Sequence, residues 1–155
     1  MHAKTDRVTL ITGASSGIGA ELARVFAAHG ARTVLVARRD DRLRKLADEI
    51  AAAGAPRPAV LACDLCAPDA AETGAAAFAA MGAEVDTVVN NAGYGLFGEA
   101  IELDRARQLA MVDLNVRLLT DLTLRFADSI VRHRGGILNV ASIASFLPGP
   151  RMAVY

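Results

Sequence analysis

Apolar and polar positions follow one another along the chain in blocks that predict strands and helices in alternation. Short runs rich in β-branched residues stand at 7–12, 32–37, 59–63, 86–90 and 135–141. Residues at helical spacing fill the stretches 18–29, 43–50, 68–81 and 109–130. The strand runs are apolar almost throughout, which is typical of strands covered on both faces. The pattern therefore predicts an α/β fold, a doubly wound parallel sheet of about five strands, as a single domain over residues 1–155.

The helix expected at 109–130 carries more apolar surface than one face holds. Its main stripe is Leu109, Val112, Val116, Leu119, Thr123, Phe126 and Ile130. A second row consists of Leu114, Leu118 and Leu122. Such a helix is either buried on two faces or used in a contact between subunits.

The composition of the chain limits the kinds of partner that it is expected to bind. The chain has 155 residues, is 53% hydrophobic and 22% charged, and has a formal net charge of zero. This balance gives no electrostatic reason to expect nucleic acid or an anionic membrane as partner. No apolar run has the ~20 residues that cross a bilayer, and residues 1–13 lack the apolar stretch of a signal peptide. A cytoplasmic protein is expected.

Two cysteines and three histidines are the candidates for a metal site. Cys63 and Cys66 form a C-x-x-C pair, but His2, His29 and His133 are scattered along the chain. Two thiolates do not complete a tetrahedral zinc site, so no metal is expected. Cys63, at the end of a strand run, is expected to be a small buried hydrophobe. His29 and His133 lie near glycines at predicted helix ends, where they are expected to cap carbonyl groups.

The stretch TGASSGIG, residues 12–19, joins the first strand to the first helix. Its glycines allow a positive φ and let a pyrophosphate approach the N–H groups at the helix N-terminus. The absence of G-K-[ST] from this stretch disfavours a nucleoside-triphosphatase P-loop. The residues expected to contact a dinucleotide here are Gly13, Ser15, Ser16, Gly17, Ile18 and Gly19.

Further polar motifs follow in order: NNAG at 90–93, Asn115 in the long helix, Ser142 after the last strand, and Tyr155. Together with T-G-x-x-x-G-x-G at 12–19, they resemble the short-chain dehydrogenase/reductase family. Members of that family have a Rossmann fold and move hydride between a nicotinamide cofactor and an alcohol or ketone. The resemblance runs from Val8 to Tyr155. It implies a small carbonyl or alcohol substrate, and a homodimer or homotetramer for the full-length protein.

The resemblance also implies roles for single residues. Tyr155 resembles the general acid/base of the family, and Ser142 the hydroxyl that bonds the same substrate oxygen. Asn115 resembles the residue that kinks the helix and anchors a water in the proton relay. Ser145 has the wrong spacing for the catalytic serine and is expected to be a loop residue. Asp64 and Leu65 resemble the pair that borders the adenine.

The resemblance implies that the loop after the fourth predicted strand contacts both the cofactor and the substrate. Asn91, Ala92 and Gly93 of the NNAG motif are expected to line the cofactor site. Residues expected to form an apolar wall of the substrate pocket are Tyr94, Leu96, Phe97 and the stretch from Pro148 to Met152.

The end of the second strand bears on the choice of cofactor. Enzymes that prefer NAD usually carry Asp or Glu there, bonded to the ribose 2′-hydroxyl. This chain has Arg38 and Arg39 instead, and a guanidinium binds a 2′-phosphate that a carboxylate would repel. NADP(H) is therefore the predicted cofactor, with NAD(H) as the alternative. Arg38 is expected to be the main contact, with Ser15 beside it.

In the family a lysine four residues after the tyrosine lowers the pKa of the phenol, which is about 10 for free tyrosine. The sequence stops at Tyr155, so we expect a truncated, cofactor-binding part of a reductase that has no turnover by itself. Two other interpretations stay open: a non-catalytic module that binds or senses a dinucleotide, and a ketoreductase domain of a larger synthase.

Overall fold

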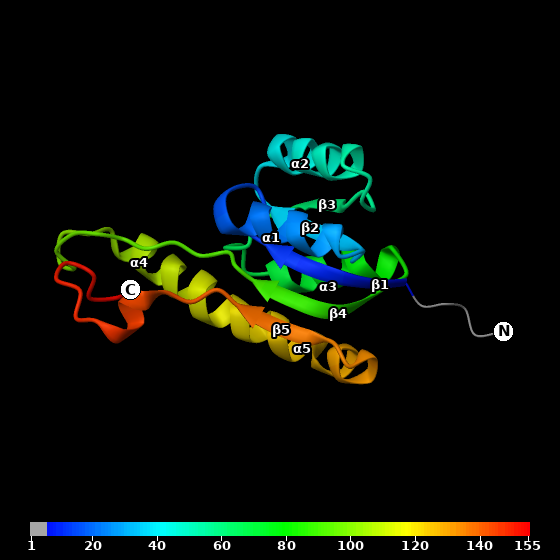
Figure 1. Cartoon of the computed structure of the whole chain (residues 1–155). Coiled ribbons are helices and arrows are strands. Elements are labelled where there is room, and N and C mark those ends of the chain that lie inside the picture. Colours follow the sequence, from blue (N-terminus) through cyan, green and yellow to red (C-terminus); the bar gives the residue numbers. More distant parts are fainter. Residues whose placement is uncertain (1–5) are drawn as a thin grey trace.

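The computed structural model describes residues 6–155. His2 and the first part of the stretch considered for a signal peptide lie outside these residues. Five parallel strands form one sheet in the order β3-β2-β1-β4-β5 (Figure 1). The strands are β1 (Asp6–Thr12), β2 (Thr33–Ala37), β3 (Ala59–Ala62), β4 (Ala83–Asn90) and β5 (Gly136–Asn139). The predicted doubly wound, Rossmann-type sheet is confirmed.

Helices cover both faces of this sheet. They are α1 (Gly17–Ala28), α2 (Asp40–Ala52), α3 (Ala70–Ala80), α4 (Arg105–Val112) and α5 (Leu119–His133), with a short 3₁₀ helix, η2 (Ile143–Phe146). One core layer packs α1 and α2 on the sheet through residues such as Ala23, Leu43 and Leu35. The other packs α3 and α5 through Phe78 and Phe126, whose rings meet edge to face at 5.5 Å. Burial on both sides explains why the strand runs are apolar throughout.

The sheet ends in an open edge at β5. Ile137 and Leu138 stay 45% and 39% exposed, in contrast to the fully buried β2. No helix or strand of residues 6–155 pairs with the outer side of β5. The strand is also shorter than the apolar run 135–141 predicted.

The single long helix predicted at 109–130 is three segments. A π-helical stretch, η1 (Asp113–Leu118), separates α4 from α5. The extra residue of the π turn rotates the helix surface, so the second apolar row becomes the buried one: Leu114 and Leu122 are buried. Leu109 and Val116, from the first half of the predicted main stripe, are exposed. The remaining row, Phe126 and Ile130, is buried as predicted.

The two histidines within the described residues have different roles. His29 is the C-cap of α1, and its Nδ1 lies 2.8 Å from the Val25 carbonyl oxygen, as the capping prediction requires. His133 is not a cap: its ring contacts the Glu84 carboxylate on β4, which Arg132 also contacts. The hydrogen bond from His133 lowers the pKa of Glu84, opposed by burial and supported by the charge of Arg132.

No helix within residues 6–155 combines the length and the apolar character that a bilayer-spanning segment needs.

The ion pair at Glu84 predicts a pH-dependent term in stability. Because the pKa of Glu84 is lowered in the folded state, its contribution is present above the unfolded pKa and is lost as pH falls through the folded value. Glu84→Gln should therefore lower the melting temperature at pH 7, and the difference from wild type should shrink toward pH 4. Thermal unfolding between pH 8 and pH 4 measures this. Glu102→Gln, which changes an exposed loop carboxylate, is the control; a constant gap for Glu84→Gln would contradict the assignment.

Candidate functional site

One buried hydroxyl, that of Thr12, joins the ends of β1 and β4. It donates to the Val89 carbonyl at 3.1 Å and accepts from the backbone N–H groups of Asn91 and Ala92, both at 3.0 Å. Thr12 is 2% exposed. These bonds fix the start of the glycine turn against the NNAG loop. The sequence placed Thr12 in the motif but did not predict this role.

The glycine turn and the NNAG loop approach each other too closely for side chains. Gly13 has φ +67°, and a Cβ there would lie 2.9 Å from the Ala92 Cα. A Cβ on Gly19 would lie 2.4 Å from the Asn91 Nδ2, which donates to the Thr12 carbonyl at 2.9 Å. The side-chain amide of Asn91 therefore holds the glycine turn in place. Gly13, Ser15 and Ser16 of this turn line a cleft.

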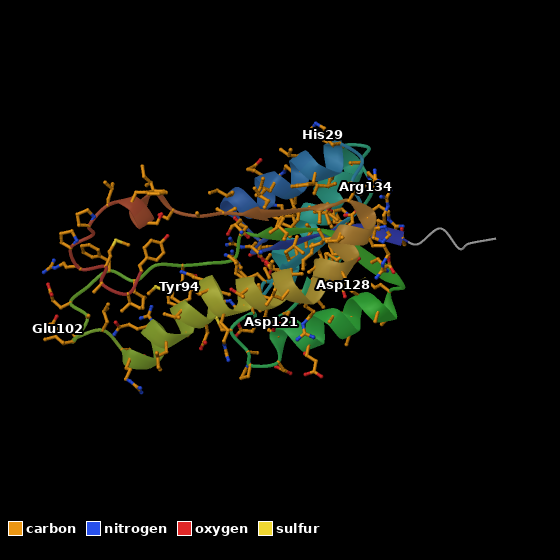
Figure 2. The ribbon with its side chains drawn as sticks, turned by 90° about the horizontal axis from the view of Figure 1, so that it is seen from below. His29, Tyr94, Glu102, Asp121, Asp128 and Arg134 are labelled. Atoms are coloured by element: carbon orange, nitrogen blue, oxygen red, sulfur yellow. The ribbon has the colours of Figure 1, made fainter. Side chains whose placement is uncertain are left out.

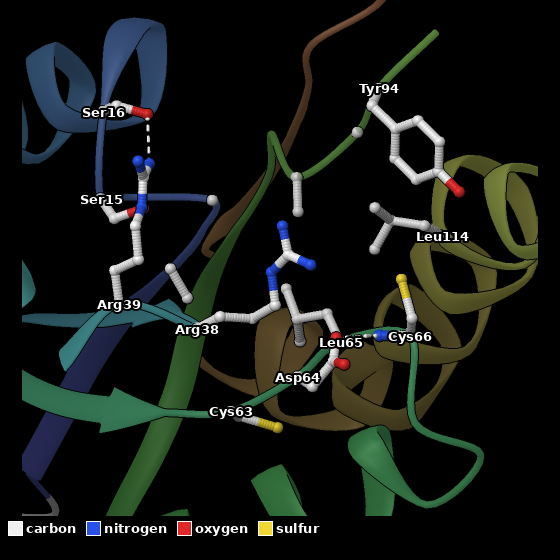
Figure 3. Close-up of a pocket in the computed structure, with 14 residues that line it drawn as sticks. Ser15, Ser16, Arg38, Arg39, Cys63, Asp64, Leu65, Cys66, Tyr94 and Leu114 are labelled. Carbon is white, nitrogen blue, oxygen red and sulfur yellow. Dashed lines mark hydrogen bonds between the residues drawn. The ribbon is translucent and has the colours of Figure 1, made fainter. Parts of the chain in front are cut away.

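A cleft of about 250 Å³ opens at the carboxyl ends of β1 to β4 (Figure 3). It is lined by Gly13, Ser15, Ser16, Ala37, Arg38, Arg39, Cys63, Asp64, Leu65, Cys66, Ala92, Gly93, Tyr94 and Leu114. The structure thus brings together most of the predicted cofactor residues from four separate loops. Gly17 lines a neighbouring groove between α1 and α2, and Ile18 is 61% exposed.

The two arginines after β2 point in different directions. The Arg39 guanidinium donates to the hydroxyls of Ser15 (2.9 Å) and Ser16 (2.8 Å) at the rim of the cleft. The Arg38 side chain extends across the middle of the cleft, between Asp64 and the Tyr94 side (Figure 3). Ser15, expected beside Arg38 at the phosphate, is hydrogen-bonded to Arg39 in this structure.

Both cysteines lie at the floor of the cleft. Cys63 packs against the core, but it is only partly buried, whereas a buried side chain was predicted. Cys66 faces the cleft near Tyr94 and Leu114 (Figure 3), a place that sequence reasoning missed. Burial, reinforced by Asp64, raises the pKa of both thiols. Within residues 6–155, no group of three or more His, Cys, Asp or Glu side chains could hold a metal ion.

Asn115 clamps the loop that follows the NNAG motif. Its Oδ1 accepts from the Tyr94 N–H at 3.1 Å and its Nδ2 donates to the Tyr94 carbonyl at 2.8 Å. Asn115 lies in the π-helical segment, consistent with the expected irregularity of the helix there. The Tyr94 hydroxyl donates to the Arg107 carbonyl at 3.0 Å, and burial raises the pKa of this phenol.

Ser142 and Tyr155 lie on the last segment of the chain. Ser142 is the N-cap of η2, and its Oγ accepts from the Ala144 N–H at 3.1 Å. The Tyr155 ring packs on Gly95, where a Cβ would lie 3.3 Å from the ring. Neither residue is among the described residues that line the 250 Å³ cleft. Ser145, expected in a loop, lies within the 3₁₀ helix η2, where its hydroxyl donates to the Ser142 carbonyl.

Comparison with known proteins gives consistent matches. The family model described as "short chain dehydrogenase" matches residues 7–155. An 11-beta-hydroxysteroid dehydrogenase of Pinus massoniana is 36% identical over 152 residues, which is 96% of this chain and 42% of that protein. The chain spans about half the length of the curated relatives it matches, with 47% and 49% for two others.

Two solved structures have the same fold. A metagenomic short-chain oxidoreductase in complex with NADP superimposes with a TM-score of 0.86 at 37% identity, covering 99% of this chain and 69% of that one. The L-sorbose reductase of Gluconobacter frateurii, complexed with NADPH and L-sorbose, gives a TM-score of 0.86 at 30% identity, covering 97% and 57%.

The three bonds of the Thr12 hydroxyl predict a cost for removing it. Thr12→Val keeps the shape of the side chain but leaves a carbonyl and two N–H groups without this partner. We expect a loss of about 1–3 kcal/mol in the free energy of unfolding, the usual cost of unpaired buried polar groups. Urea denaturation measures it.

Thr33 provides the matched control on the adjacent strand. It is buried at 3% exposure, and its Oγ1 has no hydrogen-bond partner among residues 6–155. Thr33→Val should therefore leave stability unchanged or raise it. Equal losses from the two variants would show that the Thr12 bonds contribute nothing specific.

Proposed function

The chain belongs to the short-chain dehydrogenase family, and from this we propose that it binds NADP(H) in the 250 Å³ cleft and serves hydride transfer between the nicotinamide and a ketone or secondary alcohol. The observation that carries the proposal is the convergence of the glycine turn, the arginine pair and the NNAG loop on one cleft. We take residues 1–155 as one dinucleotide-binding domain of such an enzyme. We propose a cytoplasmic location for it.

The residues present fit a phosphorylated dinucleotide. Gly13 and Gly19 keep Cβ atoms out of the place where the turn meets the NNAG loop, so the backbone of the turn can approach a pyrophosphate. Asp64 and Leu65 line the side of the cleft suited to the adenine. When bound, the cofactor would supply or accept the hydride.

The arginine pair supports a preference for NADP(H) over NAD(H). Arg39 is already held at the rim by Ser15 and Ser16, and Arg38 lies within the cleft. Two guanidinium groups and two hydroxyls form a donor set for a dianionic phosphate. No carboxylate stands at the end of β2, where one would repel that phosphate.

Proton transfer is assigned to the last segment of the chain. Tyr155 would give a proton to the substrate oxygen or take one from it. Because the Ser142 Oγ already accepts from the Ala144 N–H, its own O–H remains available to donate to the same oxygen. Asn115, through its two bonds to Tyr94, would hold the loop between the cleft and Tyr155.

We also propose self-association of the full-length protein as a homodimer or homotetramer. Support comes from Leu109, Val112 and Val116, which leave an apolar row exposed along α4 and η1. A row of this kind is commonly covered by a subunit contact.

Charge reversal at the arginines tests the cofactor assignment. Arg38→Asp and Arg39→Asp should each weaken NADPH binding by about tenfold or more, since a charge-assisted bond contributes about 1.5–3 kcal/mol. NADH binding should change little. Titration of nucleotide fluorescence with purified protein gives both dissociation constants.

Arg42→Asp on α2 is the control, with the same change of charge outside the cleft lining. Equal losses of NADPH and NADH affinity at Arg38 and Arg39 would contradict a 2′-phosphate contact. If only Arg39→Asp discriminates, the phosphate is bound at the rim, with Ser15 and Ser16.

The catalytic assignment is tested in the protein expressed from its complete open reading frame. Tyr155→Phe removes only the phenolic oxygen, so kcat for ketone reduction should fall by about 10²–10⁴. The dissociation constant for NADPH should stay within about twofold, because Tyr155 does not line the cleft. Retention of wild-type kcat would rule out Tyr155 as the acid/base.

A further inference from the structure

Two segments, 94–104 and 143–155, form a lobe that extends from the carboxyl ends of β4 and β5 (Figures 1 and 2). We name them the apolar lobe. The Gly98 N–H donates to the Arg151 carbonyl at 2.9 Å, and the Arg151 guanidinium pairs with Glu99 at 3.0 Å. Tyr155 packs on Gly95. The lobe is therefore a connected unit that holds the proposed acid/base and adjoins the cofactor cleft through Tyr94.

Large apolar side chains on this lobe face solvent. Phe97, Phe146 and Leu147 are 68%, 84% and 61% exposed. Further exposed apolar residues of the same two segments are Ile101, Ile143 and Val154. Several exposed apolar side chains on one connected unit indicate a surface that binds another molecule.

The lobe contains three carboxylates, Glu99, Glu102 and Asp104, and one cation, Arg151. Arg151 is the sole charged residue of 143–155, and it is paired with Glu99 and lies 5.9 Å from the centre of the Phe97 ring. Glu102 lies at the far tip of the lobe (Figure 2). An anionic substrate would need a cation free to pair with it. The lobe offers none within the described residues.

The hydrogen-bonding side chains of the lobe and its base are also engaged. The Tyr94 hydroxyl donates to the Arg107 carbonyl, and the Ser145 hydroxyl donates to the Ser142 carbonyl at 2.7 Å. Gln108 donates to the carbonyls of Ala100 and Leu103. A sugar requires several donors and acceptors to replace its water, and a site without them binds it poorly.

We propose that the substrate is a neutral carbonyl compound with a bulky apolar substituent, which packs on Phe97 and Phe146 while its oxygen meets Tyr155. This inference rests on the proposed function of the same site. It excludes ketoses and 2-oxo acids as preferred substrates. The relatives do not decide the matter, since the names of two of them refer to a steroid and a sugar.

The test measures NADPH oxidation by the protein from its complete open reading frame with three carbonyl compounds: benzylacetone, D-fructose and pyruvate. We expect kcat/KM for benzylacetone to exceed the other two by about a hundredfold or more. A higher value for fructose or pyruvate overturns the inference and leaves the proposed oxidoreductase intact. NADPH binding without reduction of benzylacetone also overturns it. Absence of NADPH binding would instead refute the proposed function.

Two variants locate the contact. Phe97→Asn and Phe146→Asn should each lower kcat/KM for benzylacetone by about tenfold, because an apolar contact with the substrate is lost. Their dissociation constants for NADPH should stay at the wild-type value. Val131→Asn is the matched control, since Val131 is 78% exposed near the other end of α5. Lower melting temperatures with unchanged kcat/KM for both phenylalanine variants would mean that these side chains pack on protein, which overturns the inference.

Discussion

The site depends on the contact between the carboxyl ends of β1 and β4. A parallel sheet brings these ends to one edge, but the Thr12 hydroxyl and the Asn91 amide fix how far apart they lie. Side chains at Gly13 or Gly19 would push them apart. Because the glycine turn and the NNAG loop are both positioned by this contact, the cleft between them has a defined width before any ligand enters.

From this contact the site extends in two directions. On one side, Arg39 and the serines of the glycine turn form a rim of donors, and Arg38 crosses the cleft. On the other side, Asn115 holds the backbone of Tyr94, and the chain continues into the apolar lobe with Tyr155. A polar part with two arginines, proposed for the nucleotide, is thus joined to the apolar lobe, proposed for the substrate. The short loop 93–95 connects these two parts of the site.

Much of the fold could be predicted from the sequence, because strands buried on both faces leave an unmistakable run of β-branched residues. The glycine turn could also be predicted, because few residues other than glycine allow two backbone segments to approach so closely. The π-helical segment η1 could not be predicted from the sequence. Its apolar residues fit two helical rows, and the choice between Leu114 and Val116 as the inward side depends on one extra residue in a turn.

The directions of individual side chains also could not be predicted from the sequence. Arg38 and Arg39 are adjacent and chemically alike, so the sequence could assign cofactor preference but not which arginine reaches Ser15. The place of Cys66 in the cleft could not be predicted either, because it depends on the path of the loop after β3. The roles proposed for Ser142 and Tyr155 come from motif order, and the structure adds their local hydrogen bonds and packing.

The π segment also bears on how such a site can arise. One additional residue in a helix moves the side chains on its two sides out of phase, while Leu122 and Ile130 beyond it still pack on the sheet. A single-codon insertion into an ordinary packing helix would thus bring a polar group such as Asn115 against the loop that borders the cleft, without redesign of the scaffold. Within this architecture, new chemistry can be acquired by lengthening an existing element by one position.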